Sequence, residues 1–129
     1  MKIKELLKRM VEQNASDLFY RAGGVARLRI GGKVITVDDE VLTVDSVLGA
    51  MEELTTPQQR ETFKRVLDVD FALYSDEFGR RFRINIFMQR NWPSIVIRCI
   101  NRVIQTFEEL NLPDEVLRKL CLETRGLVL

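Results

Sequence analysis

Side chains that can donate to an anion occupy alternate positions of one short stretch, residues 80–90. The odd-numbered positions from 81 to 89 are Arg, Arg, Asn, Phe and Gln, and the even-numbered positions from 82 to 88 are Phe, Ile, Ile and Met. This period of two predicts a β-strand with one apolar face and one polar face. Guanidinium groups carry planar, forked donors that match phosphate or carboxylate. Arg81 and Arg83 are therefore candidate anion-binding residues.

A second predicted strand, residues 94–100, carries a third arginine. Arg98 lies between Val96 and Ile100 on the same strand face. A charged group with apolar neighbours is costly unless it is paired. We therefore expect Arg98 to have a partner within the fold or across an interface.

Spacing alone offers a simpler explanation of Arg83. Residues 68–75 alternate like a strand and are followed by turn-forming residues. If Ser75 pairs with Arg80 in a hairpin, the apolar faces of the two strands coincide, which supports that register. Arg83 then lies diagonal to Asp70, so spacing favours a surface salt bridge, and surface pairs contribute little to stability.

Composition excludes several other chemistries. The 129 residues fit one domain, or one domain and the start of another, and 46% apolar residues suffice for a core. The net charge of +1 gives no reason to expect nucleic-acid binding. Histidine is absent and the two cysteines are Cys99 and Cys121, so neither a histidine-dependent triad nor an ordinary zinc site is expected. Two isolated cysteines fit a reducing cytoplasm, and no apolar run reaches membrane-spanning length.

Hydrophobic periodicity and turn signals predict the other elements. Thr43 can cap one helix, and Thr56, Pro57 and Gln59 start another with a capping box. We expect helices at 2–13, 43–54 and 57–67, and strands at 17–21, 25–30, 33–37, 68–75, 80–90 and 94–100. This order of elements predicts the α+β class, with a mixed or antiparallel sheet and flanking helices.

The last part of the chain has a different pattern. A linker precedes a helix that begins near Pro113, and Thr106 and Glu109 are spaced as a capping box. The final residues resemble the beginning of an apolar strand. We therefore expect a first domain at 1–102, a linker and helix at 103–125, and the start of a truncated second domain at 126–129.

Several short motifs occur in a set order along the chain. They are Ala15-Ser16-Asp17-Leu18, Gln58-Gln59-Arg60, Asp70-Phe71, Gly79-Arg80, Arg83-Ile84-Asn85-Ile86-Phe87, Gln89-Arg90, Arg98, Glu108-Glu109-Leu110-Asn111-Leu112-Pro113 and Arg125-Gly126-Leu127-Val128-Leu129. In this order they resemble the N-terminal region of the type IV pilus retraction ATPases, the PilT/PilU family of secretion-type ATPases. Phe19, and the Gly32-Lys33 pair, lean toward the PilU branch.

The resemblance implies that residues 1–102 fold as a PAS-like domain and that residues 126–129 begin a RecA-like ATPase domain. The Walker A loop and the acidic metal-binding motif would lie beyond this chain, which alone is not expected to hydrolyse ATP. The full-length protein would bind ATP and Mg²⁺ and form homohexamers. Its other partners would be further retraction ATPase subunits and the inner-membrane platform protein of the pilus, reached from the cytoplasm. Neither nucleic acid nor membrane insertion is expected.

In the family, arginines of the N-terminal domain reach the nucleotide held on the RecA-like domain. The matching positions are Arg83 and Arg98, followed by Arg81. A movable arginine neutralises the charge that builds during phosphoryl transfer only when domains close, which couples the nucleotide state to a rotation. The resemblance therefore favours an arginine-finger-like role for Arg83 and Arg98 over a purely structural one.

Two other interpretations stay open. A stand-alone PAS-like module would bind a protein or a small ligand without catalysis. An assembly-type ATPase of the same superfamily would carry additional N-terminal domains, whereas this sequence begins at Met1 with the PAS-like pattern.

Overall fold

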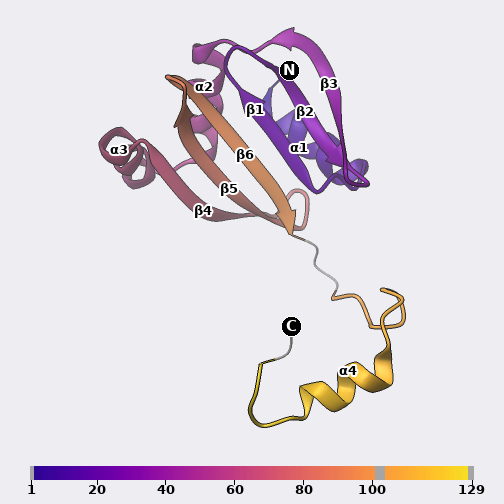
Figure 1. Ribbon diagram of the computed structural model, residues 1–129. Helices are drawn as coiled ribbons and strands as arrows, with labels where there is room; N and C mark the ends of the chain where they lie inside the picture. Colours follow the sequence, from indigo (N-terminus) through magenta and orange to yellow (C-terminus); the bar gives the residue numbers. More distant parts are fainter. Residues whose placement is uncertain (1, 101–103, 128–129) are drawn as a thin grey trace.

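A six-stranded sheet is the central element of the computed structural model, which describes residues 2–100 and 104–127 (Figure 1). The strands are β1 (Asp17–Arg21), β2 (Val25–Ile30), β3 (Lys33–Val41), β4 (Asp68–Ser75), β5 (Arg80–Gln89) and β6 (Trp92–Ile100). Their order across the sheet is β3-β2-β1-β6-β5-β4, and every neighbouring pair is antiparallel. An early three-stranded unit and a late one therefore join where β1 pairs with β6.

The register expected for the β4–β5 hairpin is confirmed. Ser75 pairs with Arg80, and Phe71 pairs with Ile84. The apolar positions of both strands consequently share one face, as the matching of their patterns predicted.

Two strand bounds differ from the expectation by more than one residue. β3 continues to Val41 because, beyond a register shift, Val41 still pairs with Val25 at the start of β2. β6 begins at Trp92 because Trp92 and Pro93 pair with the end of β5. The proline is accommodated next to the turn, at the beginning of the strand, where a missing N–H costs least.

Three helices pack against one face of the sheet, and Figure 1 shows α1 and α2 behind it. They are α1 (Ile3–Glu12), α2 (Val44–Leu54) and α3 (Pro57–Val66). Thr43 caps α2 by accepting a hydrogen bond from the Ser46 N–H at 3.1 Å. The capping box of α3 also forms: the Thr56 N–H donates to Gln59 Oε1 at 2.8 Å, and the Gln59 N–H donates to Thr56 Oγ1 at 3.4 Å.

One hydrophobic core lies between these helices and the sheet. Its fully buried members include Leu6, Met10, Leu18, Leu28, Val47, Phe82, Ile84, Ile86, Ile95 and Ile97. Because side chains alternate along a strand, burial of the even-numbered residues of β5 leaves its odd-numbered residues on the opposite face. The α+β class with flanking helices is confirmed, and the sheet is antiparallel rather than mixed.

Residues 104–127 contain α4 (Asp114–Cys121), whose start agrees with the helix expected to begin near Pro113. The predicted capping box is present, because the Thr106 N–H donates to Glu109 Oε2 at 2.8 Å and the Glu109 N–H donates to Thr106 Oγ1 at 3.2 Å. It closes a turn, not a regular helix. The expected strand at 126–129 lies partly outside the described residues, and residues 126–127 belong to no strand.

α4 is amphipathic, yet none of its residues is buried. Val116 and Leu120 are among its exposed apolar side chains. In the part of the chain that the structure describes, no helix has the length and apolar character needed to cross a membrane.

Candidate functional site

A row of charged side chains crosses the open face of the sheet, opposite the helices. Arg29 of β2 pairs with Asp17 of β1, Asp17 pairs with Arg98 of β6, and Arg98 pairs with Arg83 of β5. The two arginines selected from the sequence are thus direct cross-strand neighbours. Like charges in this relation are unfavourable unless each has a counter-ion.

Asp17 provides a counter-ion for Arg98. Arg98 Nε donates to Asp17 Oδ1 at 2.9 Å, while Arg29 Nε lies 3.1 Å from Asp17 Oδ2. The Ser16 hydroxyl donates to Oδ2 at 2.9 Å. The Asp17 side chain is 7% exposed and that of Arg98 is 66% exposed. The apolar neighbours of Arg98 along β6 therefore do not define its surroundings, because its cross-strand neighbours are charged.

The pKa of Asp17 reflects opposing effects. Burial alone would raise the pKa of this carboxyl group. Hydrogen bonds from Arg98 and Ser16, together with the charges of Arg98 and Arg29, outweigh burial and lower the pKa below its usual value. Asp17 is consequently ionised at neutral pH and holds both arginines.

Arg83 is held differently. Arg83 Nε lies 3.1 Å from both Asp70 oxygens, and Nη2 donates to Oδ2 at 2.7 Å. Both side chains are substantially exposed, at 65% for Arg83 and 40% for Asp70. The hydrogen bond from Arg83 lowers the pKa of Asp70, and the same bond raises the pKa of Arg83. The salt bridge expected from spacing is present, and it engages two of the three guanidinium nitrogens.

The two arginines line a shared cavity of about 450 Å³, which we call the arginine groove. Its lining residues are Asp17, Asp68, Asp70, Arg83, Asn85, Val96 and Arg98. Arg81 is not among them; it pairs with Tyr74 and Ile100 farther along β5. The structure therefore brings Arg83 and Arg98 together and leaves Arg81 apart.

The charges that line the arginine groove do not favour the binding of a free anion. Its lining contains three carboxylates and two guanidinium groups. Asp68 accepts a hydrogen bond from the Asn85 amide at 3.1 Å, so this carboxylate is also partnered. No excess of positive charge draws a polyphosphate from solution. The side chains of Arg98 and Arg83 are nevertheless more than half exposed in this groove.

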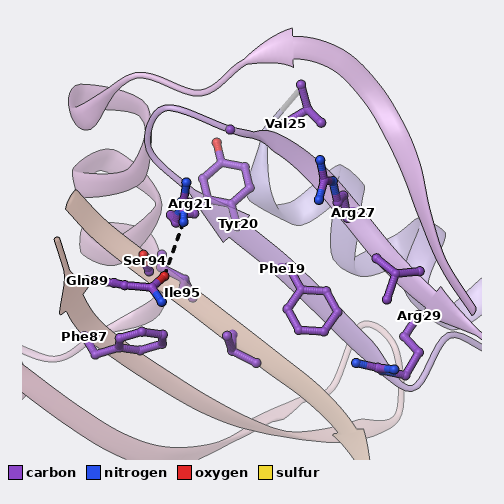
Figure 2. A pocket seen from close by; sticks show the side chains of 13 residues that line it. Phe19, Tyr20, Arg21, Val25, Arg27, Arg29, Phe87, Gln89, Ser94 and Ile95 are labelled. Atoms are coloured by element: carbon purple, nitrogen blue, oxygen red, sulfur yellow. Dashed lines mark hydrogen bonds between the residues drawn. The ribbon is translucent and has the colours of Figure 1, made fainter. Parts of the chain in front are cut away.

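A second cavity, of about 530 Å³, adjoins β1 and β2 on the open face (Figure 2). Its lining includes the apolar side chains of Phe19, Val25, Val34, Phe87 and Val96 and the basic side chains of Arg21, Arg27 and Arg29. We call it the aromatic groove. The Arg29 guanidinium lies 5.4 Å from the centroid of the Phe19 ring, and Arg21 Nη1 donates to Gln89 Oε1 at 3.4 Å. An apolar floor with arginines around it suits a protein surface that combines apolar and acidic side chains.

Sequence reasoning missed Asp17 as a member of the site. Its alternation with Leu18 does place it on the polar face of β1. Its partner Arg98 is 81 positions away, and no hairpin connects their strands. A search for a carboxylate on the polar face of another strand would have included Asp17 without singling it out.

The described residues contain no group of three or more His, Cys, Asp or Glu side chains arranged to hold a metal ion. Arg83 and Arg98 fit phosphate oxygens by charge and donor geometry. The groove carboxylates are already engaged by arginine or asparagine side chains. These residues therefore fit the phosphates of a nucleotide but not its Mg²⁺.

Comparison with known proteins identifies relatives along the whole chain. No protein-family model matches it. It is 41% identical over 133 residues to the type IV pilus ATPase PilU of Pseudomonas aeruginosa, and 33% identical over 129 residues to the type IV pilus retraction ATPase PilT of the same organism. Both matches cover 100% of this chain but only 33% of PilU and 37% of PilT. The chain thus spans about a third of the length of these relatives.

Solved structures agree with this relationship. The crystal structure of the pilus retraction motor PilT with bound ADP matches 92% of this chain and 34% of its own, with a TM-score of 0.76 and 30% identity. The Legionella pneumophila ATPase DotB matches 90% of this chain and 33% of its own, with a TM-score of 0.67 at 18% identity, which supports the fold alone. The fold is therefore that of the α+β N-terminal domain of such ATPases. The chain belongs to the PilT/PilU family, as an N-terminal portion of such a protein.

Proposed function

We propose that this chain is the N-terminal domain of a pilus retraction ATPase and that it contributes Arg98 and Arg83 to ATP held on a RecA-like domain. The observation that supports this most is their cross-strand pairing on an uncovered sheet face. Arg98 is paired with Asp17 of β1, and Arg83 is paired with Asp70 of β4. Both arginines line the same groove. The Mg²⁺ of the nucleotide would be held by residues outside this chain.

The proposed role follows from the positions of the phosphoryl charge and of the two guanidinium groups. Bound ATP supplies a phosphoryl group whose transfer spreads negative charge over its oxygens. Two guanidinium groups on a rigid sheet offer preorganised donors to that charge. Because they belong to a separate domain, they reach the phosphates only in a closed arrangement, and rotation of this domain accompanies turnover. Arg81, which does not line the groove, would have a smaller effect.

Substitution in the full-length protein tests this proposal. We expect Arg98→Ala to lower kcat for ATP hydrolysis by roughly 10³-fold, the lower end of the range for arginine fingers. Arg83→Ala should have a smaller effect in the same direction, because part of its guanidinium is engaged by Asp70. Residues 1–129 alone should neither bind nor hydrolyse ATP. Arg65→Ala, on the exposed side of α3, is a matched control that should turn over normally.

The results separate the two classes of protein. Loss of turnover in the full-length variants, with an inert fragment, supports a motor whose arginines act across domains. Normal turnover with Arg98→Ala and Arg83→Ala would show that both arginines are structural. The domain would then be better explained as a partner-binding module, the alternative that the sequence left open.

We also propose that the aromatic groove receives a neighbouring subunit in a homohexamer. Support comes from its apolar floor and from Arg27, for which no ion pair is present within the described residues. The neighbour would present apolar side chains flanked by carboxylates. We further propose that the full-length protein contacts the pilus platform protein and lies at the cytoplasmic side of the inner membrane.

A charge reversal tests the subunit contact. Arg27→Glu in the full-length protein should reduce the hexamer fraction measured by native mass spectrometry. Lys33→Glu, in the turn-proximal end of β3 and outside the groove, makes the same charge change and should leave assembly intact. Equal assembly of both variants would place the subunit contact on another surface.

A further inference from the structure

Asp17 is a buried carboxylate on the uncovered face of the sheet. Aspartate is rarely buried unless it is paired. Here the backbone of the preceding residue restrains its position: the Ser16 N–H donates to the Arg29 carbonyl at 2.8 Å, and the Cys99 N–H donates to the Ser16 carbonyl at 3.0 Å. Asp17 is therefore tied to β2 and to β6 at the same point.

The bond that Asp17 makes with Arg98 leaves the far end of the arginine available. Arg98 donates to Asp17 through Nε, and within the described residues its two terminal amino groups make no hydrogen bond. Fixing Nε restrains the side chain, while the terminal nitrogens keep the forked geometry that suits a phosphate. Arg29 pairs with the second oxygen of Asp17, so this oxygen has a partner without a further donor from Arg98.

Asp70 does not hold Arg83 in this way. It takes up Nε and Nη2 together, and both partners are exposed. A phosphate approaching Arg83 competes with Asp70 for the same donors, whereas a phosphate approaching Arg98 does not compete with Asp17. The two carboxylates consequently have different consequences for the arginines that they contact.

We infer that Asp17 is a positioning residue that presents Arg98 to the nucleotide, an inference that rests on the function proposed above. A misplacement of about 1 Å in a transition-state contact can lower a rate on the order of 100-fold. Asp17 acts through Arg98 and does not itself touch the nucleotide. Its replacement should affect turnover only while Arg98 is present.

A double-mutant cycle in the full-length protein tests this dependence. Asp17→Asn keeps the side-chain shape and should lower kcat on the order of ten- to a hundredfold, with a small change in KM. In the Arg98→Ala background, Asp17→Asn should produce little further loss, because Arg98→Ala already removes the side chain through which Asp17 acts. Asp39→Asn removes an exposed carboxylate of β3 and serves as the control, with expected wild-type turnover.

A spectroscopic readout on residues 1–129 covers the case in which full-length Asp17→Asn does not assemble. The Nε–H of Arg98 should exchange slowly with solvent by NMR, and that of Arg81 quickly, since Arg81 makes no hydrogen bond within the described residues. In Asp17→Ala, which has no side-chain acceptor, the Arg98 signal should exchange as fast as that of Arg81. A slow Arg98 signal in this variant would overturn the inference.

The kinetic outcomes separate this inference from the proposed function. If Arg98→Ala leaves turnover unchanged, the proposed function fails. If Arg98→Ala lowers turnover but Asp17→Asn has no effect, or has a loss that adds fully to that of Arg98→Ala, the positioning role fails while the nucleotide contact stands. A loss that appears only with Arg98 present supports both.

Discussion

Arg98 and Arg83 face each other across two strands, but their carboxylate partners differ in burial. Asp17 is 7% exposed and is shared between two arginines, whereas Asp70 is 40% exposed and binds one. The carboxylate of the first pair is shielded from water, whereas both members of the second are exposed and their attraction is weakened by water and salt. We therefore expect Arg98 to be held more firmly than Arg83.

This difference suits the two arginines to different steps of the proposed cycle. In that proposal, Arg98 would keep a set position on the sheet whether or not a nucleotide is present. Arg83 must give up part of its contact with Asp70 before it can donate fully to a phosphate. On domain closure, the phosphate would thus contact Arg98 first. Arg83 would then exchange part of its contact with Asp70 for a contact with the phosphate.

The largest effect expected from this comparison is on stability. Asp17→Asn should destabilise residues 1–129 by about 1.5–3 kcal/mol, because hydrogen bonds to charged groups are lost and the new amide N–H₂ faces the Arg29 guanidinium. Asp70→Asn should change the free energy of unfolding little, as is usual for exposed pairs. Urea unfolding of the wild type and both variants measures the two values. Equal losses would show that burial does not distinguish the pairs.

Local sequence patterns predicted one pair and not the other for a physical reason. Asp70 and Arg83 are 13 positions apart in one hairpin, and the coincidence of apolar faces set their register. Asp17 and Arg98 meet only because β1 pairs with β6, a contact between segments far apart in the chain. Periodicity locates strands but does not state which distant strands pair.

The rest of the fold shows the same division. Capping boxes at Thr56 and Thr106 and the bounds of most strands follow from nearby residues, and the structure has them. The added length of β3 and the early start of β6 depend on partners across the sheet. The arginine groove likewise required the strand order, since its lining residues come from β1, β4, β5 and β6.

A smaller effect is expected on how the free energy of unfolding changes with pH, through the Asp17 and Asp70 ion pairs. The pKa of Asp17 is lowered in the folded state, so its ionised form is favoured by folding. Its contribution is fully present above the unfolded-state pKa of about 3.9 and is lost as the pH falls through the lower folded-state pKa. The pKa of Asp70 is also lowered, so the same window applies to it with a smaller amplitude, because its partner is exposed.

Urea unfolding between pH 7 and pH 2.5 should therefore show a constant gap between wild type and Asp17→Asn down to about pH 5, and a narrowing gap below it. The gap between wild type and Asp70→Asn should be small at every pH and close over the same range. Neither gap should widen on acidification, because protonation removes in the wild type the charge that the variants already lack. A gap for Asp17→Asn that persists unchanged at pH 2.5 would contradict the assignment of its effect to the charge of Asp17, because protonation should remove that charge from the wild type.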